Sequence, residues 1–126
     1  MRRAALVLAV TAFVMVLSKQ TVRAAAEPAD ALRGEAVFKR RCTGCHALDV
    51  DREGPRLRGV YGRKAASVAG FAYSGALKKS GVLWDDVALD RWLTDTDAAV
   101  PGNDMGFRLP KEQERADLIA YLKTAK

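Results

Sequence analysis

The two cysteines and the only histidine of the chain lie within five consecutive residues, Cys42-Thr43-Gly44-Cys45-His46. Two thiols about one helical turn apart can form thioether bonds with two vinyl groups on one edge of a porphyrin, and the next residue can place an imidazole under the iron. This spacing is the attachment signature of c-type haem. We therefore expect one covalently attached haem c, bound through Cys42 and Cys45, with His46 as an axial iron ligand.

Three other interpretations compete for this motif. A thioredoxin-type redox pair needs a βαβ setting, whereas the residues around this pair follow a helical pattern. A zinc site needs about four ligands, and the chain has no further cysteine or histidine. Chance occurrence is the third, and the export signal described below disfavours it, because covalent haem attachment takes place outside the cytoplasm. A disulfide is also a poor explanation, because it would close a very small loop.

Met105 is the candidate for the second axial position of the iron. It is the only methionine after residue 26, and it ends the constrained segment 100–105, Val-Pro-Gly-Asn-Asp-Met. A lone methionine is usually core filler or a surface residue. A thioether, however, is a soft ligand that favours ferrous iron, and an iron with two fixed ligands suits electron transfer better than peroxide chemistry. We expect His46 and Met105 as the metal ligands and no catalytic residue.

The amino terminus has the layout of a secretory signal peptide. A basic start, Met1 to Arg3, precedes the uncharged apolar run Ala4 to Leu17, and the small residues Ala24 to Ala26 follow. This order predicts a signal peptide over residues 1–26, cleaved after Ala26, and a haem domain over residues 27–126. The alternative is an uncleaved anchor, although the 14 uncharged residues fall short of the roughly 20 that span a bilayer. The expected location is periplasmic, with a membrane-tethered form as the alternative.

The basic character of the chain belongs mostly to this segment. The formal net charge is +6, and residues 1–26 contain four basic residues and no acidic one. Their removal leaves 17 basic and 15 acidic residues, a net charge of +2. The charge therefore gives no support to nucleic-acid binding.

The remaining residues predict an all-α domain of short helices and long loops. Periodicity and capping residues place helices over residues 30–41, 74–80, 85–95 and 110–126, with a shorter turn near 97–100. Pro110 suits the first turn of the last helix. The long loop 47–70 needs something to pack on, and a flat apolar cofactor would supply it.

A series of short segments around these elements matches a known family in the same order. Beyond the cysteine motif they are residues 34–38, 54–59, 62–64, 70–74, 84, 100–105 and 114–122. Over nearly all of residues 30–123 the chain resembles the class I cytochromes c, within them the mitochondrial-like and bacterial soluble branch. The resemblance implies the cytochrome c fold, wrapped around one covalent haem, with Gly34 and Phe38 crossing Leu118 and Tyr121.

The resemblance also implies haem-binding roles. Pro55 would accept a hydrogen bond from the free ring N–H of His46 and so fix the orientation of the ring. Arg63, Tyr73 and Trp84 match positions near the haem propionates, where a guanidinium, a phenol and an indole N–H are the donors that a buried carboxylate requires. Plain core packing is the competing interpretation for the aromatic residues.

The chain departs from the family pattern at several positions. Trp92 stands where a tyrosine near Met105 is common in the family, so the usual hydrogen bond from a phenol to the sulfur is in doubt. For Trp92, a role at the haem and plain core packing are equal alternatives. Leu77 and Asn103 replace other polar residues, and no glycine follows Phe107. We expect these differences to affect the reduction potential and the Met105 segment, and to leave the ligand set unchanged.

The predicted function is one-electron transfer by a monomer in a respiratory, photosynthetic or dehydrogenase-linked chain. The resemblance implies partners such as quinol–cytochrome c reductase, a terminal oxidase, a reaction centre or a periplasmic dehydrogenase. Two alternatives remain: a dedicated electron-acceptor subunit of one dehydrogenase, and a small haem enzyme with peroxidase-like activity, while a non-haem dithiol protein is more distant. Basic residues at 39, 40, 41, 63, 64, 78, 79, 108 and 111 would form a docking ring or, alternatively, an ordinary mixed-charge surface.

Overall fold

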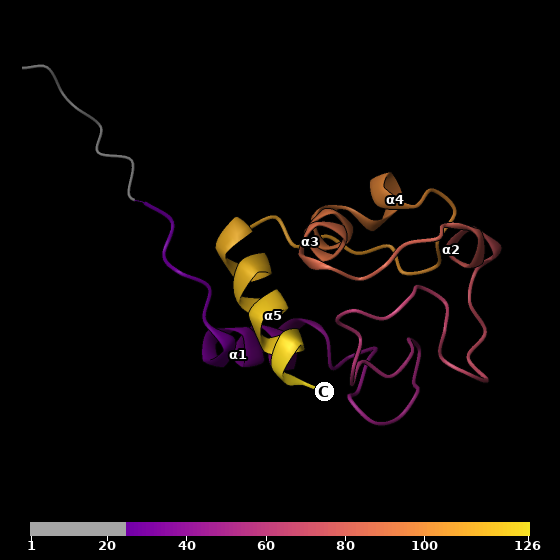
Figure 1. The fold of residues 1–126 in the computed structure, drawn as a ribbon, viewed down its shortest axis with the longest axis horizontal. Helices are drawn as coiled ribbons and strands as arrows, with labels where there is room; N and C mark the ends of the chain where they lie inside the picture. The colour runs from indigo at the N-terminus through magenta and orange to yellow at the C-terminus, as the bar shows by residue number, and fades with distance from the viewer. Residues whose placement is uncertain (1–24) are drawn as a thin grey trace, which may run out of the picture.

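The computed structural model describes residues 25–126 and contains five helices in that part of the chain (Figure 1). They are α1 (Ala31–Arg41), α2 (Gly75–Lys79), α3 (Asp86–Thr94), α4 (Thr96–Ala99) and α5 (Glu112–Thr124). The all-α prediction is confirmed, since the β-type pairing within residues 25–126 is limited to one isolated bridge between Lys64 and Leu83. The predicted signal peptide lies outside the described residues except for Ala25 and Ala26.

Short polar side chains set the start of the first four helices; the sequence predicts the first three of them, and α4 begins at Thr96 where a turn near 97–100 was expected. Each of these side chains accepts a hydrogen bond from a backbone N–H of the first turn, a group that has no partner within the helix itself. The caps are Asp30 for α1, Ser74 for α2, Asp85 for α3 and Asp95 for α4. No helix of the described residues is long and apolar enough to cross a membrane.

The prediction that Pro110 lies in the first turn of the last helix is wrong. Helix α5 begins at Glu112, and Pro110 lies in the segment before it. This segment is held in place from both sides: the N–H of Leu109 donates to the carbonyl of Leu93 at 2.7 Å, and Nη1 of Arg115 donates to the carbonyls of Leu109 and Pro110, each at 3.0 Å. The helix therefore begins at Glu112, beyond the residues that these contacts hold.

Helices α1 and α5 cross in direct contact (Figure 1). A Cβ on Gly34 would lie 1.9 Å from the carbonyl oxygen of Asp117 and 2.8 Å from the Cβ of Tyr121, so only glycine allows this approach. One turn later, the ring of Phe38 packs 5.3 Å from that of Tyr121, centroid to centroid. The expected crossing of the first and last helices is therefore confirmed, and it places the end of α1 beside α5.

A buried carboxylate secures this crossing at the amino end of α1. Asp117 is 3% exposed and accepts hydrogen bonds from the N–H of Asp30 and from Nε of Arg33, both at 2.8 Å. The Arg33 guanidinium is the main reason why the pKa of Asp117 lies below its ordinary value, and desolvation only partly opposes it. Asp117 is therefore ionised and ties α5 to the residues that begin α1.

Candidate functional site

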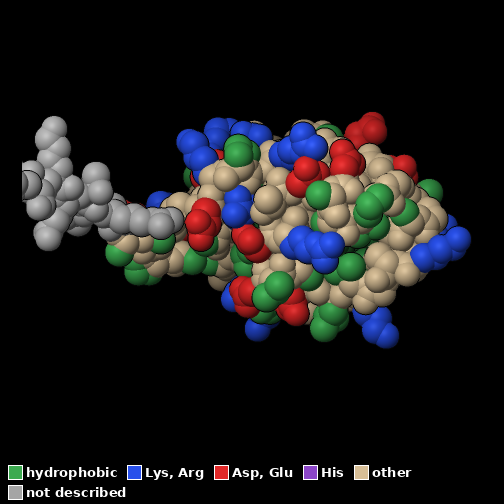
Figure 2. All heavy atoms as spheres, turned by 90° about the horizontal axis from the view of Figure 1, so that it is seen from above, with side chains coloured by type: hydrophobic (Ala, Val, Ile, Leu, Met, Phe, Trp, Pro, Cys, Tyr) green, Lys and Arg blue, Asp and Glu red, His purple; other side chains and the backbone are tan. Residues whose placement is uncertain are grey.

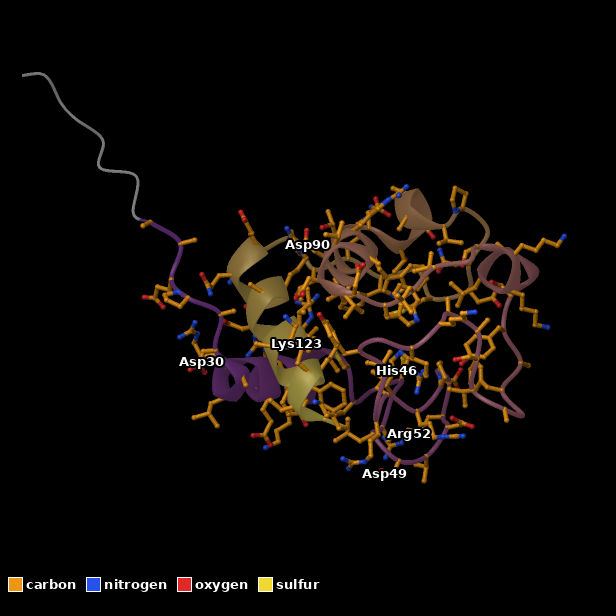
Figure 3. All side chains as sticks on the ribbon, in the orientation of Figure 1. Asp30, His46, Asp49, Arg52, Asp90 and Lys123 are labelled. Atoms are coloured by element: carbon orange, nitrogen blue, oxygen red, sulfur yellow. The ribbon has the colours of Figure 1, made fainter. Side chains whose placement is uncertain are left out.

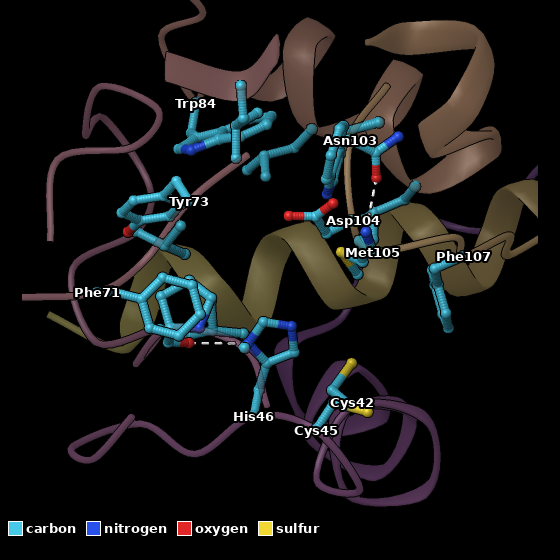
Figure 4. Close-up of a pocket in the computed structure, with 18 of the residues that line it drawn as sticks. Cys42, Cys45, His46, Phe71, Tyr73, Trp84, Asn103, Asp104, Met105 and Phe107 are labelled. Carbon is cyan, nitrogen blue, oxygen red and sulfur yellow. Dashed lines mark hydrogen bonds between the residues drawn. The ribbon is translucent and has the colours of Figure 1, made fainter. Parts of the chain in front are cut away.

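A cavity of about 390 Å³ opens among α1, α5, the loop 42–74 and the segment around Met105 (Figure 4). All eight site residues predicted from the sequence line it: Cys42, Cys45, His46, Pro55, Arg63, Tyr73, Trp84 and Met105. Much of the remaining wall is apolar and comes from Phe38, Leu57, Val60, Leu89, Trp92, Leu93, Leu118 and Leu122. One cavity therefore unites residues that are far apart in the sequence.

The cysteine motif continues from the end of α1 as a tight turn. The N–H of Cys42 donates to the carbonyl of Phe38 at 2.8 Å, and the carbonyl of Cys42 accepts from the N–H of Cys45 at 3.1 Å and of His46 at 2.9 Å. Cys42 is half-buried and Cys45 is exposed. Before haem attachment, burial raises the pKa of the Cys42 thiol to about 11. The turn directs both sulfur atoms and the imidazole to one cavity.

The imidazole of His46 is held in one orientation. Its Nδ1 donates to the carbonyl of Pro55 at 2.8 Å, and the residue is only 8% exposed. Desolvation lowers the pKa of His46, and the hydrogen bond to Pro55 opposes that shift in part, so the ring is neutral at pH 7. With Nδ1 engaged, Nε2 of the neutral ring remains as the metal-binding atom. Figure 3 shows the place of His46 in the fold, on the chain segment that follows α1.

Gly54 is a site residue that the sequence analysis treated only as loop and family pattern. A Cβ at this position would lie 2.2 Å from Cε1 and 2.6 Å from Nδ1 of His46. The backbone N–H of Gly54 also donates to the carbonyl of Cys45 at 2.9 Å. Glycine is required here because the backbone lies directly against the imidazole. The available signal was its position immediately before Pro55.

Met105 lies across the cavity from His46 and the cysteines (Figure 4). Its backbone N–H donates to Oδ1 of Asn103 at 2.8 Å. The side chain is 37% exposed and lines the cavity from the side opposite the imidazole. Two candidate ligands, a nitrogen and a thioether sulfur, therefore face one cavity from two sides.

Arg63 and Trp84 are brought together by their backbones, because the N–H of Trp84 donates to the carbonyl of Arg63 at 3.0 Å. The guanidinium of Arg63 donates to the carbonyls of Arg58 and Arg56, both at 3.0 Å, and no carboxylate within residues 25–126 pairs with it. Desolvation is the main reason why the pKa of Arg63 lies below its ordinary value. A half-buried cation of this kind is suited to an anionic group inside the cavity.

Tyr73 and Trp84 lie on the same side of the cavity (Figure 4). The hydroxyl of Tyr73 accepts from the N–H of Val68 at 3.2 Å, which leaves its hydrogen free to donate. Trp84 packs 5.3 Å from Trp92, centroid to centroid, and both indoles are buried. Trp92 is thus part of the core and of the cavity wall at the same time, and within the described residues it makes no hydrogen bond to Met105.

The arrangement fits a haem. Two thiols and an imidazole occupy one side and a thioether the other, which is the donor set of a six-coordinate c-type site. Arg63, Tyr73 and Trp84 supply the cavity wall with donors of the kind that buried carboxylates require, and apolar side chains form much of the remaining wall. When bound, the haem supplies an iron that accepts and releases one electron.

A protein-family model described as cytochrome c matches residues 31–126. Among similar proteins, cytochrome c of Chlamydomonas reinhardtii is 44% identical over 106 residues, which are 81% of this chain and 95% of that protein. Cytochrome c of Sesamum indicum is 41% identical, over 79% of this chain and 94% of that protein.

Two solved bacterial structures are similar in fold and in sequence. Cytochrome cH from Methylobacterium extorquens is 43% identical with a TM-score of 0.72, over 75% of this chain and 98% of that chain. Ferricytochrome c2 from Rhodopseudomonas palustris is 40% identical with a TM-score of 0.72, over 77% of this chain and 99% of that chain.

The contact between Gly54 and His46 predicts a large difference between two glycine substitutions. Gly54→Ala should lower the free energy of unfolding of the haem-bound protein by about 1–3 kcal/mol, because the new methyl group overlaps the imidazole. Gly44→Ala is the matched control, since a Cβ there meets nothing within 4 Å. Denaturant unfolding measures both variants, and equal stabilities would contradict the close approach.

Proposed function

Because the chain belongs to the cytochrome c family, and is thus an electron carrier with one covalently attached haem c, we propose that His46 and Met105 are the axial ligands of its iron. The observation that carries this proposal is their placement across one cavity, with Nδ1 of His46 engaged by Pro55 and Nε2 left free. Cys42 and Cys45 supply the thioether attachment. Pro55 orients the imidazole and strengthens it as a ligand.

The residues around the ligands would limit the structural rearrangement that follows a change in the oxidation state of the iron. The apolar wall excludes water, so little solvent has to reorganise when an electron enters or leaves. Arg63, Tyr73 and Trp84 are positioned to donate hydrogen bonds to the propionates and so to balance buried negative charge. A peroxidase-like reaction needs an open face on the iron, and in this proposal Met105 occupies that face.

The basic residues near the cavity support a docking surface that is smaller than the nine-residue ring considered from sequence. Four of those nine have a carboxylate partner: Lys39, Arg40, Arg108 and Lys111. Within residues 25–126 the other five have none, and three of these line the cavity itself; the five are Arg41, Arg63, Lys64, Lys78 and Lys79. Figure 2 shows basic and acidic side chains interspersed on one face of the molecule. Steering of an acidic redox partner would therefore depend on a few basic residues.

We propose a terminal oxidase, a quinol–cytochrome c reductase, a reaction centre or a periplasmic dehydrogenase as the partner class. Electron transfer to a terminal oxidase can be tested directly. The reduced protein should transfer electrons to an oxidised cytochrome c oxidase, with a second-order rate constant that falls about tenfold or more as the ionic strength rises. Stopped-flow absorbance measures this rate. Lys78→Gln combined with Lys79→Gln should weaken the salt dependence.

Lys39→Gln is the control for this experiment, since Lys39 already pairs with Glu35 at 2.7 Å. Its effect on the salt dependence should be smaller. The absence of electron transfer to any cytochrome or oxidase partner would contradict the carrier function for these partner classes.

We also propose that the chain is a bacterial periplasmic protein whose first 26 residues are removed. The basic, apolar and small-residue order of this segment supports export. In the described part of the chain, Ala26 and Glu27 are exposed and outside any helix, as a peptidase requires of its substrate.

Expression of the full chain together with a haem-maturation system, followed by cell fractionation and intact mass measurement, tests this location. The expected product is a periplasmic haem protein that begins at Glu27. A full-length product in the membrane fraction would instead establish the uncleaved anchor.

A further inference from the structure

We propose that Thr96 and Asn103 are positioning residues that hold Met105 over the cavity and slow its departure from the iron. This inference rests on the proposed function, in which Met105 is an iron ligand. It concerns the Met105 loop, residues 100–107, which leads from α4 to the segment before α5.

Thr96 joins the two ends of the Met105 loop. At the far end, its N–H donates to the carbonyl of Phe107 at 3.1 Å, and its Oγ1 accepts from the N–H of Phe107 at 2.8 Å. At the near end, its carbonyl accepts from the N–H of Val100 at 3.0 Å. Thr96 is 0% exposed, so each of these groups would lack a water molecule as a substitute partner.

Asn103 braces the interior of the same loop. Its Nδ2 donates to the carbonyls of Thr96 at 2.9 Å and Val100 at 3.0 Å, and it also lies 3.2 Å from a carboxylate oxygen of Asp97. Its Oδ1 accepts from the N–H of Met105 at 2.8 Å, a bond drawn in Figure 4. One side-chain amide therefore links the backbone of Met105 to the residue that closes the loop.

The loop has few other means of fixing Met105. Gly102 and Gly106 flank the methionine, with φ of 85° and 57°, and such glycines leave the unfolded loop many conformations. The backbone of residues 100–107 adds one hydrogen bond of its own, from the N–H of Asn103 to the carbonyl of Val100 at 3.2 Å. The hydrogen bonds of Thr96 and of the Asn103 side chain are thus the main contacts that hold the backbone of the loop at Met105.

These hydrogen bonds have a kinetic consequence. An external ligand can reach the iron on the Met105 side only after the methionine has moved away, and movement of the loop requires that the hydrogen bonds of Asn103 or Thr96 break. Asn103, Val100 and Phe107 all bind to Thr96, so the loss of one of these hydrogen bonds weakens the attachment of the whole loop to Thr96. Variants of either residue should therefore open more often without a change in the ligand itself.

The test is the rate of cyanide binding to the ferric, haem-bound protein, measured together with the methionine–ferric charge-transfer band. Asn103→Ala and Thr96→Val should each bind cyanide roughly tenfold faster, since a net hydrogen bond changes an equilibrium by about that factor. Thr94→Val is the matched control for Thr96→Val, because the Thr94 hydroxyl donates to the carbonyl of Asp90 outside the loop. The band should persist in all three.

A second control separates positioning from general loss of stability. Asp117→Asn weakens the α1–α5 contact far from the loop, and it should lower the free energy of unfolding without a comparable rise in the cyanide rate. If the rates of all variants simply follow their global stabilities, the inference is wrong. Should Asn103→Ala yield no haem protein, Thr96→Val still decides the question.

Met105→Ala distinguishes failure of this inference from failure of the proposed function. If that variant keeps the charge-transfer band, Met105 is not the ligand and both proposals are overturned. If it loses the band while Asn103→Ala and Thr96→Val bind cyanide at the rate of the unmodified protein, only the positioning role is overturned.

Discussion

The close approach of α1 and α5 at Gly34 is the constraint on which the rest of the structure depends. With no side chain at Gly34, the backbone of α1 can lie against that of α5, and Phe38 and Tyr121 then pack one turn further along. This contact fixes the end of α1, from which the Cys42–His46 turn continues. Leu118 and Leu122 of α5 form a wall of the same cavity. The helix crossing thereby sets the cysteine motif against the apolar surface that a haem needs.

The two sides of the cavity are held by different physical means. His46 is fixed by burial, by its hydrogen bond to Pro55 and by the backbone of Gly54 against its ring. Met105 lies in a loop with two positive-φ glycines, and the backbone of that loop is held chiefly by the hydrogen bonds of Asn103 and Thr96. We infer that the methionine side is the more adaptable one, so it is also the side on which sequence changes can tune the reduction potential and ligand access while attachment stays intact.

Much of this organisation could be predicted from the sequence, because local chemistry determines it. Asp30, Ser74 and Asp85 cap three helices that lie within the expected ranges 30–41, 74–80 and 85–95, and the cysteine motif and Met105 line one cavity. The last helix begins at Glu112 and not at Pro110, because the N–H of Leu109 is bound to the carbonyl of Leu93, a residue distant in the sequence, and Arg115 binds the carbonyls of Leu109 and Pro110. The contact of Gly54 with His46 was not predicted, and Asn103 was singled out only as a departure from the family pattern near Met105; the contacts of both residues arise from the folded conformation of their loops.

The central claim is that His46 and Met105 close both faces of a single covalent haem. Its most direct test is the absorption spectrum of the mature haem-bound protein in both oxidation states at neutral pH, with carbon monoxide added to the ferrous form. The predicted result is one low-spin haem with a methionine–ferric charge-transfer band and no rapid carbon monoxide binding. A high-spin ferric spectrum together with tight carbon monoxide binding would contradict the closed site.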